Sequence, residues 1–319
     1  MKTYFVIIIP CKGYNEYLNK TIKGCLNQTF KDFKIYLLPD NNFENNIFKN
    51  DKIVIKSTGN YFPGKKRNIG IEISEAEVYA FIDSDAIPER VWLEKAYNYL
   101  KDEKIKIIGG PNLTPAESNL REKISGILLS NFLVTGKFSI RYKKNLKLET
   151  VLELPLCNLF IKNEVFKSVG KFKENTLTAE DADFCFRAKK LGIDTKYSSE
   201  IVVYHKRRPI FLPYLNQIFQ YAFDKGYRIK KNFVPKYLYY FLPSFFLIFL
   251  LIGLYSLIFF KNFLFFYCFF ISLYFFLVFI SCLINWKYLF YIFSGIILTH
   301  LVYGSGFIIG LFSKRENEN

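Results

Sequence analysis

Short apolar runs alternate with amphipathic stretches over roughly the first third of the chain. Uninterrupted apolar residues predict buried strands at Tyr4–Ile9, Phe33–Leu38, Ile53–Ile55, Val78–Ile82 and Ile105–Gly110. Between them, helices are predicted through Leu18, Ile22 and Leu26, and at Gly64–Ile73 and Trp92–Leu100. Strands that alternate with helices in this rhythm indicate a doubly wound α/β sheet.

Beyond Pro111 the alternation weakens, but further elements are still predicted. Leu156–Ile161 and Ile201–Tyr204 have the composition of strands, and Ala179–Leu191 is predicted as a helix. Glu117–Gly136 is apolar and compatible with a helix. The α/β domain is therefore expected to continue to about residue 205.

The last part of the chain is apolar on every face of any helix it forms. Three spans, Tyr237–Phe260, Phe263–Ile284 and Tyr288–Phe312, each reach the length of about 20 residues that a helix needs to cross a bilayer. The preceding stretch, Pro209–Phe223, has its apolar residues on one face. It is equally compatible with a helix that lies flat on a membrane and with an ordinary packing helix.

The charge of the chain is strongly positive, with 44 Lys and Arg against 28 Asp and Glu and a formal net charge of +16. A codon bias toward lysine explains this composition as well as a function does. A dense basic patch, however, lies just before the apolar tail: His205 to Arg208, Lys225, Arg228, Lys230 and Lys231. Because basic residues flank membrane spans on the cytoplasmic side, this end is predicted to be cytoplasmic. No nucleic-acid-binding motif accompanies the charge, so we expect membrane lipids and no nucleic acid as partners.

Cysteines and the amino terminus add little to this picture. The six cysteines form no C-x-x-C pair and no zinc-binding spacing, so reduced, buried thiols are expected. The first apolar run is too short for a signal peptide, which favours a cytoplasmic location for the α/β domain.

Two acidic clusters carry the candidate chemistry. Asp83-Ser84-Asp85 directly follows a predicted buried strand, where open α/β sheets bind ligands. Carboxylates there can hold a hard divalent cation, and the cation can hold a diphosphate. The second cluster, Glu180 to Asp183, opens a predicted helix. Taken singly, the first is compatible with a solvated turn and the second with helix capping; together they suit group transfer from an activated nucleotide.

Five stretches in this order and spacing carry a resemblance to a known family. They are Phe5–Pro10 with Asn15-Glu16, Gly64–Gly70, Phe81–Asp85, Asn158–Ile161 and Glu180–Arg187. On these stretches, residues 1–205 resemble the family 2 glycosyltransferases of the GT-A fold. The resemblance implies a Rossmann-like GT-A catalytic domain at 1–205. A basic amphipathic interface segment is expected at 206–236, and an all-α transmembrane segment of about three helices at 237–319.

The resemblance also implies donor-binding residues. Pro10 and Glu16 would border the nucleotide base, and Asp40 would bond the base or the ribose. Asp40 is followed by two asparagines, where the family often has a second acid and a hydroxyl residue, so the base is left open. Arg67 would line the nucleotide pocket, and the less favoured alternative is that it belongs to a solvated basic helix face.

Metal, base and acceptor roles follow from the same resemblance. Asp83 and Asp85 would bind Mg²⁺ or Mn²⁺ on the diphosphate, Asp83 touching the ribose or the metal. His205 would complete the metal site or belong to the basic patch. Asp181 is the candidate general base, because an acceptor hydroxyl must lose its proton as it attacks. Three residues are placed on the acceptor side: Asn158, Glu180 and Arg187.

The expected function is sugar transfer, with inversion, from a nucleotide-sugar donor to a hydroxyl of a lipid-linked or cell-envelope glycan. The enzyme would be a multi-pass protein of the cell membrane with a cytoplasmic catalytic domain. The stretch Gln217–Tyr221 lacks the Arg and Trp of the Q-x-x-R-W motif of processive synthases, which argues against polymer extrusion. Two alternatives stay open: a polyprenyl-phosphate glycosyl synthase, and a non-catalytic membrane scaffold.

Overall fold

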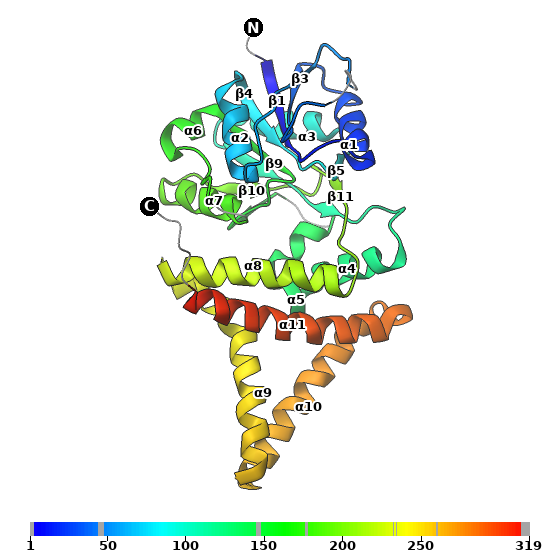
Figure 1. Cartoon of the computed structure of the whole chain (residues 1–319), viewed down its shortest axis with the longest axis vertical. Helices are drawn as coiled ribbons and strands as arrows, with labels where there is room; N and C mark the ends of the chain where they lie inside the picture. Colours follow the sequence, from blue (N-terminus) through cyan, green and yellow to red (C-terminus); the bar gives the residue numbers. More distant parts are fainter. Residues whose placement is uncertain are drawn as a thin grey trace. The chain divides into compact units, whose positions relative to one another are not determined.

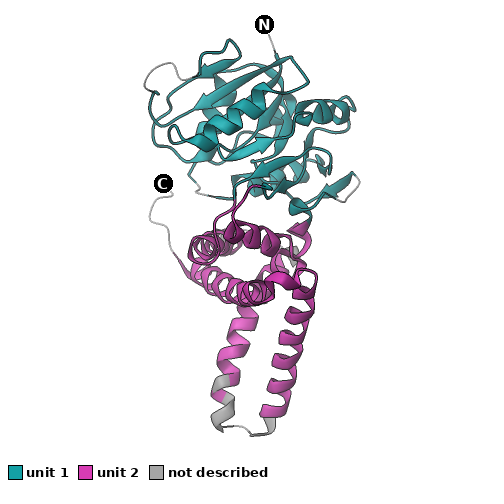
Figure 2. Cartoon of the chain, turned by 90° about the vertical axis from the view of Figure 1, so that its right-hand side faces the viewer, with its two compact units in different colours: residues 1–116, 140–206 teal, residues 117–139, 207–319 magenta. Residues whose placement is uncertain are grey.

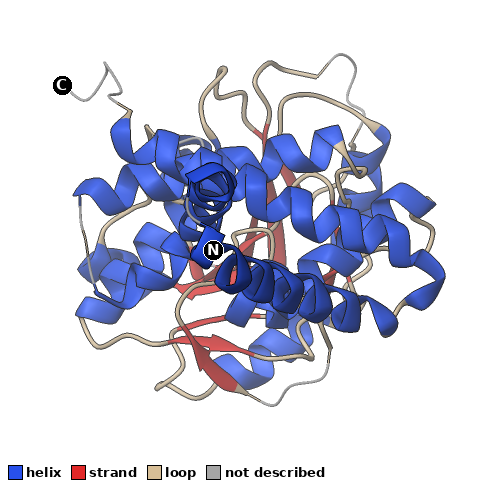
Figure 3. Cartoon of the chain, turned by 90° about the horizontal axis from the view of Figure 1, so that it is seen from below, coloured by secondary structure: helices blue, strands red, loops and turns tan. Residues whose placement is uncertain are grey.

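The computed structural model of the chain describes residues 3–43, 48–144, 148–175, 178–231, 233, 235–259 and 261–313. These residues form two compact units, and the chain passes between them more than once (Figure 2). Unit 1 contains residues 1–116 and 140–206, and unit 2 contains residues 117–139 and 207–319. All the described strands belong to unit 1, whereas the regular structure described in unit 2 is helical. Figure 3 shows the strands in red and the helices in blue.

Unit 1 is built on an eight-stranded sheet with the strand order β3-β2-β1-β4-β9-β6-β10-β8 (Figure 1). The strands are β1 (Thr3–Pro10), β2 (Phe33–Leu38), β3 (Ile53–Ile55), β4 (Ala76–Phe81), β6 (Ile107–Gly109), β8 (Glu149–Val151), β9 (Leu159–Lys162) and β10 (Thr195–Tyr197). The first four are parallel to one another, whereas β9 runs antiparallel to both of its neighbours, β4 and β6. The carboxyl ends of β1, β2 and β4 therefore meet at one edge of the sheet.

Helices cover both faces of this sheet. Side chains of β1 alternate, so that Phe5, Ile7 and Ile9 join one apolar core and Val6 and Ile8 join the other. The first core is closed by α1 (Glu16–Leu26) and α3 (Trp92–Leu100). The second is closed by α2 (Pro63–Glu72), α6 (Asn163–Val169) and α7 (Glu180–Lys190). This three-layer arrangement confirms the predicted α/β fold.

A small second sheet lies at the end of β4 and positions the acidic turn. It has the order β5-β11-β7, formed by β5 (Ala86–Pro88), β11 (Val203–His205) and β7 (Asn112–Leu113). The central strand β11 pairs antiparallel with β5, and His205 lies opposite Ala86. Because Ala86 directly follows Asp85, this register brings His205 beside the acidic turn.

Unit 2 consists of helices and short 3₁₀ turns. The helices are α4 (Leu120–Ser130), α5 (Phe132–Thr135), α8 (Leu212–Lys231), α9 (Leu242–Phe259), α10 (Lys261–Leu283) and α11 (Leu289–Phe312). The 3₁₀ turns are at Gly136–Tyr142, whose last residues belong to unit 1, and at Pro235–Phe241 and Trp286–Tyr288.

Helices α8 and α11 lie side by side in parallel (Figure 1). The hydroxyls of Tyr214 and Thr299 are 3.1 Å apart near one end, and Lys230 Nζ lies 3.4 Å from the Ser313 carbonyl oxygen near the other. Between these contacts the backbones nearly touch, since a Cβ placed on Gly310 would lie 2.1 Å from the Phe223 carbonyl oxygen. Small residues allow this close packing, as they do between membrane helices.

Helices α9 and α10 extend away from this pair within unit 2 (Figure 1). Among the described residues, two helical stretches are long and apolar enough to cross a membrane, Leu264–Leu283 and Trp286–Phe312. Tyr237–Gly253 forms a shorter apolar stretch. The sequence predicts about three spans, so length and composition in the structure identify one fewer.

Candidate active site

The turn that carries Asp83 and Asp85 is fixed by hydrogen bonds from three directions. Ala86 N donates to the Asp83 carbonyl at 3.1 Å and closes the turn. The Thr21 hydroxyl, on α1, donates to the Ser84 carbonyl at 3.1 Å, and Lys206 N donates to the Asp85 carbonyl at 3.1 Å. Both carboxylates are partly exposed at the end of β4, so the turn presents two acids on a rigid support.

His205 joins the two acids. Its Nε2 atom lies 3.3 Å from Asp85 Oδ1 and 3.7 Å from Asp83 Oδ2. Sulfur is also near, because one ligand atom each of Asp83, Cys157 and His205 lies within 4.8 Å of the other two. Oxygen, nitrogen and sulfur atoms grouped in this way fit a divalent metal.

Arg67 connects this turn to the second acidic cluster. Its Nη2 donates to Asp83 Oδ1 and its Nη1 to Glu180 Oε1, each at 2.6 Å. Burial alone would lower the pKa of the guanidinium, but the carboxylates of Asp83, Glu180 and Asp181 outweigh it and raise the pKa. The arginine therefore stays charged and holds the two acidic clusters in one site.

Asp83 is ionised in this setting. Burial works to raise the pKa of its carboxyl, but the hydrogen bond with His205 and the charge of Arg67 hold the pKa below its usual range. An ionised carboxylate next to a histidine is the state that a metal ligand requires.

Glu180 and Asp181 open α7 but differ in environment. Glu180 is buried against Arg67, and burial raises the pKa of its carboxyl to about 7, with the Asp181 charge adding to the effect. Asp181 is less buried, and its Oδ1 accepts a hydrogen bond from Ala182 N at 2.7 Å. Ala179, just before the pair, has a left-handed backbone with φ of 72°. Such strained residues cluster at functional sites.

The raised pKa of Glu180 predicts how stability depends on pH. A glutamate has a pKa of about 4.3 in an unfolded chain, against about 7 for folded Glu180. The folded state thus binds this proton more tightly, so the stabilisation is complete below about pH 4 and is lost as the pH rises through about 7. We expect the melting temperature of the wild type, measured against that of Glu180→Gln, to fall between about pH 5 and pH 8.

Thermal unfolding of the purified chain across this pH range checks the prediction. Glu164→Gln is the control, because the side chain of Glu164 is 55% exposed and its removal leaves the Glu180 equilibrium untouched. Melting curves of the wild type and Glu180→Gln that shift in parallel with pH would contradict the assignment.

The predicted donor-side residues lie at the ends of β1 and β2. Pro10 ends β1 and pairs with Leu38 in β2, and Asp40 follows two residues later. Asp40 forms an ion pair with buried Lys66, whose Nζ also donates to the Cys11 carbonyl at 2.6 Å. Glu16 is exposed at the start of α1. Contact of Pro10, Glu16 and Asp40 with a nucleotide stays a prediction. Lys66 was not singled out in the sequence, because it lies in a run of three basic residues, 65–67, but the structure places it beside Asp40.

Two predicted acceptor-side residues use their polar groups inside the fold. Asn158 accepts from Trp92 Nε1 at 2.8 Å and donates to the carbonyls of Pro111 at 3.0 Å and Ile201 at 2.7 Å. Arg187 Nε donates to Asp183 at 2.8 Å, and its Nη2 donates to the Lys171 carbonyl at 2.7 Å. These bonds give Asn158 and Arg187 positioning roles, while contact with an acceptor stays a prediction.

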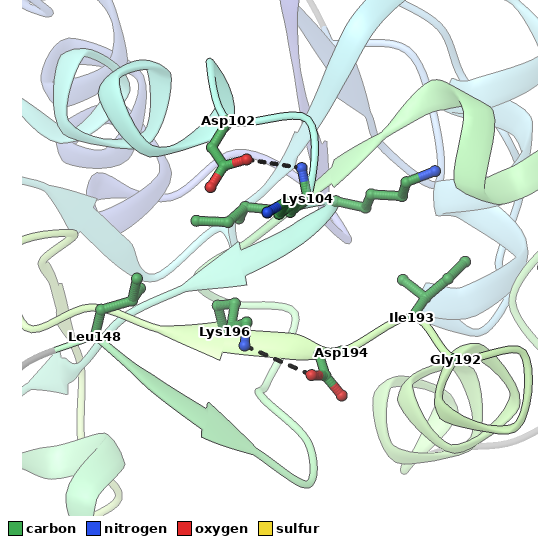
Figure 4. Close-up of a pocket in the computed structure, with 9 residues that line it drawn as sticks. Asp102, Lys104, Leu148, Gly192, Ile193, Asp194 and Lys196 are labelled. Carbon is green, nitrogen blue, oxygen red and sulfur yellow. Dashed lines mark hydrogen bonds and ion pairs between the residues drawn. The ribbon is translucent and has the colours of Figure 1, made fainter.

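A hollow of about 360 Å³ lies elsewhere in unit 1 (Figure 4). It is lined by Asp102, Lys104, Ile105, Lys106, Leu148, Gly192, Ile193, Asp194 and Lys196. Lys196 pairs with Asp194 at 3.5 Å, and Lys104 N donates to the Asp102 carboxylate at 2.9 Å. The residues of the two acidic clusters are not among its lining, so the candidate site rests on the carboxylates at the end of β4.

Comparison with known proteins identifies relatives for most of unit 1. The profile of Glycosyl transferase family 2 matches residues 6–170. Poly(ribitol-phosphate) beta-N-acetylglucosaminyltransferase TarP of Staphylococcus aureus (strain N315) is 28% identical over 62% of each chain. Glycosyltransferase AglE of Haloferax volcanii is 25% identical over 64% of this chain and 67% of its own. The O-antigen chain rhamnosyltransferase WbaN of Salmonella anatum is 28% identical over 55% of each chain.

A solved structure supports the fold. Mannosyltransferase PcManGT from Pyrobaculum calidifontis, in complex with GDP-Man and Mn²⁺, matches with a TM-score of 0.50. The match covers 71% of this chain and 63% of that one at 13% identity. This likeness concerns the fold alone, which agrees with the GT-A architecture expected from the sequence.

Proposed function

The chain belongs to glycosyl transferase family 2, a family of transferase enzymes, and from this premise we propose its reaction. It transfers a sugar from a nucleotide-sugar donor to a hydroxyl of a lipid-linked or cell-envelope glycan. The observation that carries this proposal is the pair of 2.6 Å bonds from Arg67 to Asp83 and Glu180, which unites the two acidic clusters. The names of TarP and WbaN, which refer to poly(ribitol-phosphate) and an O-antigen chain, support an envelope glycan as acceptor.

The proposed chemistry divides between the two clusters. Asp85, Asp83 and His205 would hold Mg²⁺ or Mn²⁺, which when bound supplies positive charge against the departing nucleoside diphosphate. Asp181 removes the proton from the acceptor hydroxyl as its oxygen attacks the anomeric carbon. Because a single displacement takes place opposite the leaving group, the configuration at that carbon is inverted. Arg67 orients Asp83 and Glu180 through its two hydrogen bonds and offsets part of their negative charge.

Turnover of a donor panel tests this function. The purified full chain, with Mn²⁺ added, should hydrolyse one of a set of nucleotide sugars or transfer its sugar. Release of the nucleoside diphosphate measures both reactions. Calorimetry should show Mn²⁺-dependent binding of the corresponding nucleoside diphosphate. If every nucleotide sugar stays intact and every nucleoside diphosphate fails to bind, the scaffold alternative replaces the enzyme.

For unit 2 we propose a membrane topology with two crossings. Helices α9 and α10 have 18 and 23 residues, or about 27 and 34 Å at 1.5 Å per residue, close to the roughly 30 Å of bilayer hydrocarbon. Their rings meet, since the Phe249 and Tyr267 centroids are 5.3 Å apart. The pair therefore fits a transmembrane hairpin.

Helix α11 is apolar enough to span, but its packing favours the interface. It lies parallel to α8, whose sequence includes Asp224, Lys225, Arg228 and Lys230. Charges in the middle of a membrane span are costly, so α8 belongs at the surface. Since α11 is held along α8, it lies at the same depth. Two crossings return the chain to its starting side, which the basic residues mark as cytoplasmic.

Fluorescent-protein fusions check this topology. A green fluorescent protein joined after residue 313 should fluoresce, because it folds in the cytoplasm and not after export. An epitope inserted at the α9–α10 connection should be accessible to antibody from outside the cell. A dark carboxyl-terminal fusion, with an exported phosphatase fusion active at the same position, would indicate three crossings and contradict the proposal.

A further inference from the structure

We propose that Cys157 is a sulfur ligand of the metal site, which makes this site a mixed oxygen, nitrogen and sulfur centre. Such a centre prefers Co²⁺ and Zn²⁺ to Mg²⁺, because thiolate is a soft ligand and Mg²⁺ prefers oxygen. The inference rests on the proposed metal-dependent function and adds a residue and a metal preference to it.

The geometry brings three ligand atoms close together. One atom each of Asp83, Cys157 and His205 lies within 4.8 Å of the other two. Atoms bound to one zinc ion at about 2.0–2.3 Å in a tetrahedron lie roughly 3.3–3.8 Å apart. Side-chain movements of about 1 Å therefore suffice to bring these three atoms to the spacing of a zinc site.

The sheet fixes the position of Cys157. In the antiparallel pair β4–β9, Phe81 lies opposite Leu159. Cys157 lies in the turn two residues before β9 begins, and Asp83 lies two residues after β4 ends, so both are at the same edge of the sheet. His205 reaches that edge from β11. The three ligands thus come from the ends of three strands that are paired or linked through the acidic turn.

The chain around Cys157 is held firmly. The next residue, Asn158, makes three side-chain bonds, described above, and its backbone N donates to the Pro155 carbonyl at 3.1 Å. A Cβ added at Gly109 would lie 2.2 Å from the Asn158 carbonyl oxygen, which shows how closely the backbones pack. Metal sites need ligands positioned by such an outer layer of bonds. Asn158 therefore holds the backbone next to Cys157 in place.

Cys11 and Cys185 are two other buried thiols of unit 1. Among the described residues, neither belongs to a group of potential metal ligands. Cys11 is a matched control, since it is 6% exposed and Cys157 is 5% exposed.

Cobalt binding tests the inference through a signal that does not depend on catalysis. The full chain, stripped of metal by a chelator, is titrated with Co²⁺ while calorimetry measures binding and near-ultraviolet absorption measures thiolate-to-cobalt charge transfer. We expect charge-transfer absorption in the wild type and in Cys11→Ser, and its loss in Cys157→Ser. The Zn²⁺ affinity of Cys157→Ser should fall at least as far as the tenfold to hundredfold caused by losing an outer-layer partner, with Mg²⁺ affinity unchanged.

Each result decides a different point. Co²⁺ binding without charge transfer in the wild type, or charge transfer that persists in Cys157→Ser, overturns the sulfur ligand and leaves the proposed function standing. Failure of Co²⁺ and Mn²⁺ to bind at all overturns both. Should Cys157→Ser not fold, alkylation of the wild type followed by mass spectrometry gives the answer. Bound Zn²⁺ should slow alkylation of Cys157 and leave that of Cys11 unchanged, and equal rates with and without Zn²⁺ would refute the proposal.

Discussion

Replacing Asp181 with asparagine should lower kcat by two to four orders of magnitude, the usual contribution of a general base, while donor binding stays unchanged. The amide is nearly the same size as the carboxylate but cannot accept the acceptor's proton. Asp181 is the less buried acid at the start of α7, whereas its neighbour Glu180 is committed to Arg67. Steady-state rates and calorimetric donor affinity, measured on the same preparation, check both halves of the prediction.

Asp183→Asn is the control for this experiment. It removes an acid from the same first turn of α7, where acids also stabilise the helix dipole. Asp183 bonds Arg187 at 2.8 Å and Lys173 at 2.8 Å, so its loss should lower the melting temperature with little effect on kcat. A rate that Asp181→Asn leaves intact would mean that the acceptor arrives already ionised. The polyprenyl-phosphate alternative would then be favoured, because a phosphate needs no base.

Replacing Asp85 with asparagine should abolish the metal dependence of donor binding. In the wild type, His205 Nε2 lies 3.3 Å from an oxygen of the Asp85 carboxylate. The substitution removes that charge from the turn, so His205 faces a neutral amide. A metal ion contributes several kcal/mol of charge stabilisation, so a loss of about 3 kcal/mol corresponds to roughly a hundredfold weaker binding of the nucleoside diphosphate. Calorimetry with and without Mn²⁺ measures the difference.

Glu89→Gln provides the comparison for Asp85→Asn. Glu89 follows β5 in the same segment and bonds Lys144 at 2.9 Å and Tyr204 at 3.0 Å instead of His205. Glu89→Gln should keep the full Mn²⁺ dependence of nucleoside diphosphate binding. If Asp85→Asn also retained that effect, the acidic turn would not be the metal site.

Long strands and helices could be predicted because burial leaves a pattern in the sequence. The apolar run at Phe33–Leu38 and the stretch Trp92–Leu100 agree with β2 and α3. Strands β7, β8 and β10 have two or three residues, too few to show a period, and they lack the continuous apolar run that predicts the equally short β3. These strands exist because neighbouring strands pair with them, as β11 does with β5 and β7, and such pairing is a property of the tertiary fold.

The candidate site was predictable only in its motif residues. Asp83, Asp85, Asp181 and His205 fall in recognisable stretches. The bonds that connect the two acidic clusters, however, join Arg67 to Asp83 and Glu180, which lie 16 and 113 positions away in the sequence. Cys157 carried no signal, because its place beside Asp83 depends on the register of β4 with β9. In the same way, a linear sequence gives no sign that residues 117–139 pack with residues 207–319.

Anomalous X-ray diffraction from crystals grown with Mn²⁺ and the nucleoside diphosphate tests the central claim most directly. We predict a manganese peak bonded to the Asp85 carboxylate and to the diphosphate, with Asp181 on the far side of the sugar-binding space from the leaving group. A nucleotide bound at the ends of β1 and β2 with no manganese beside Asp83 or Asp85 would contradict the account.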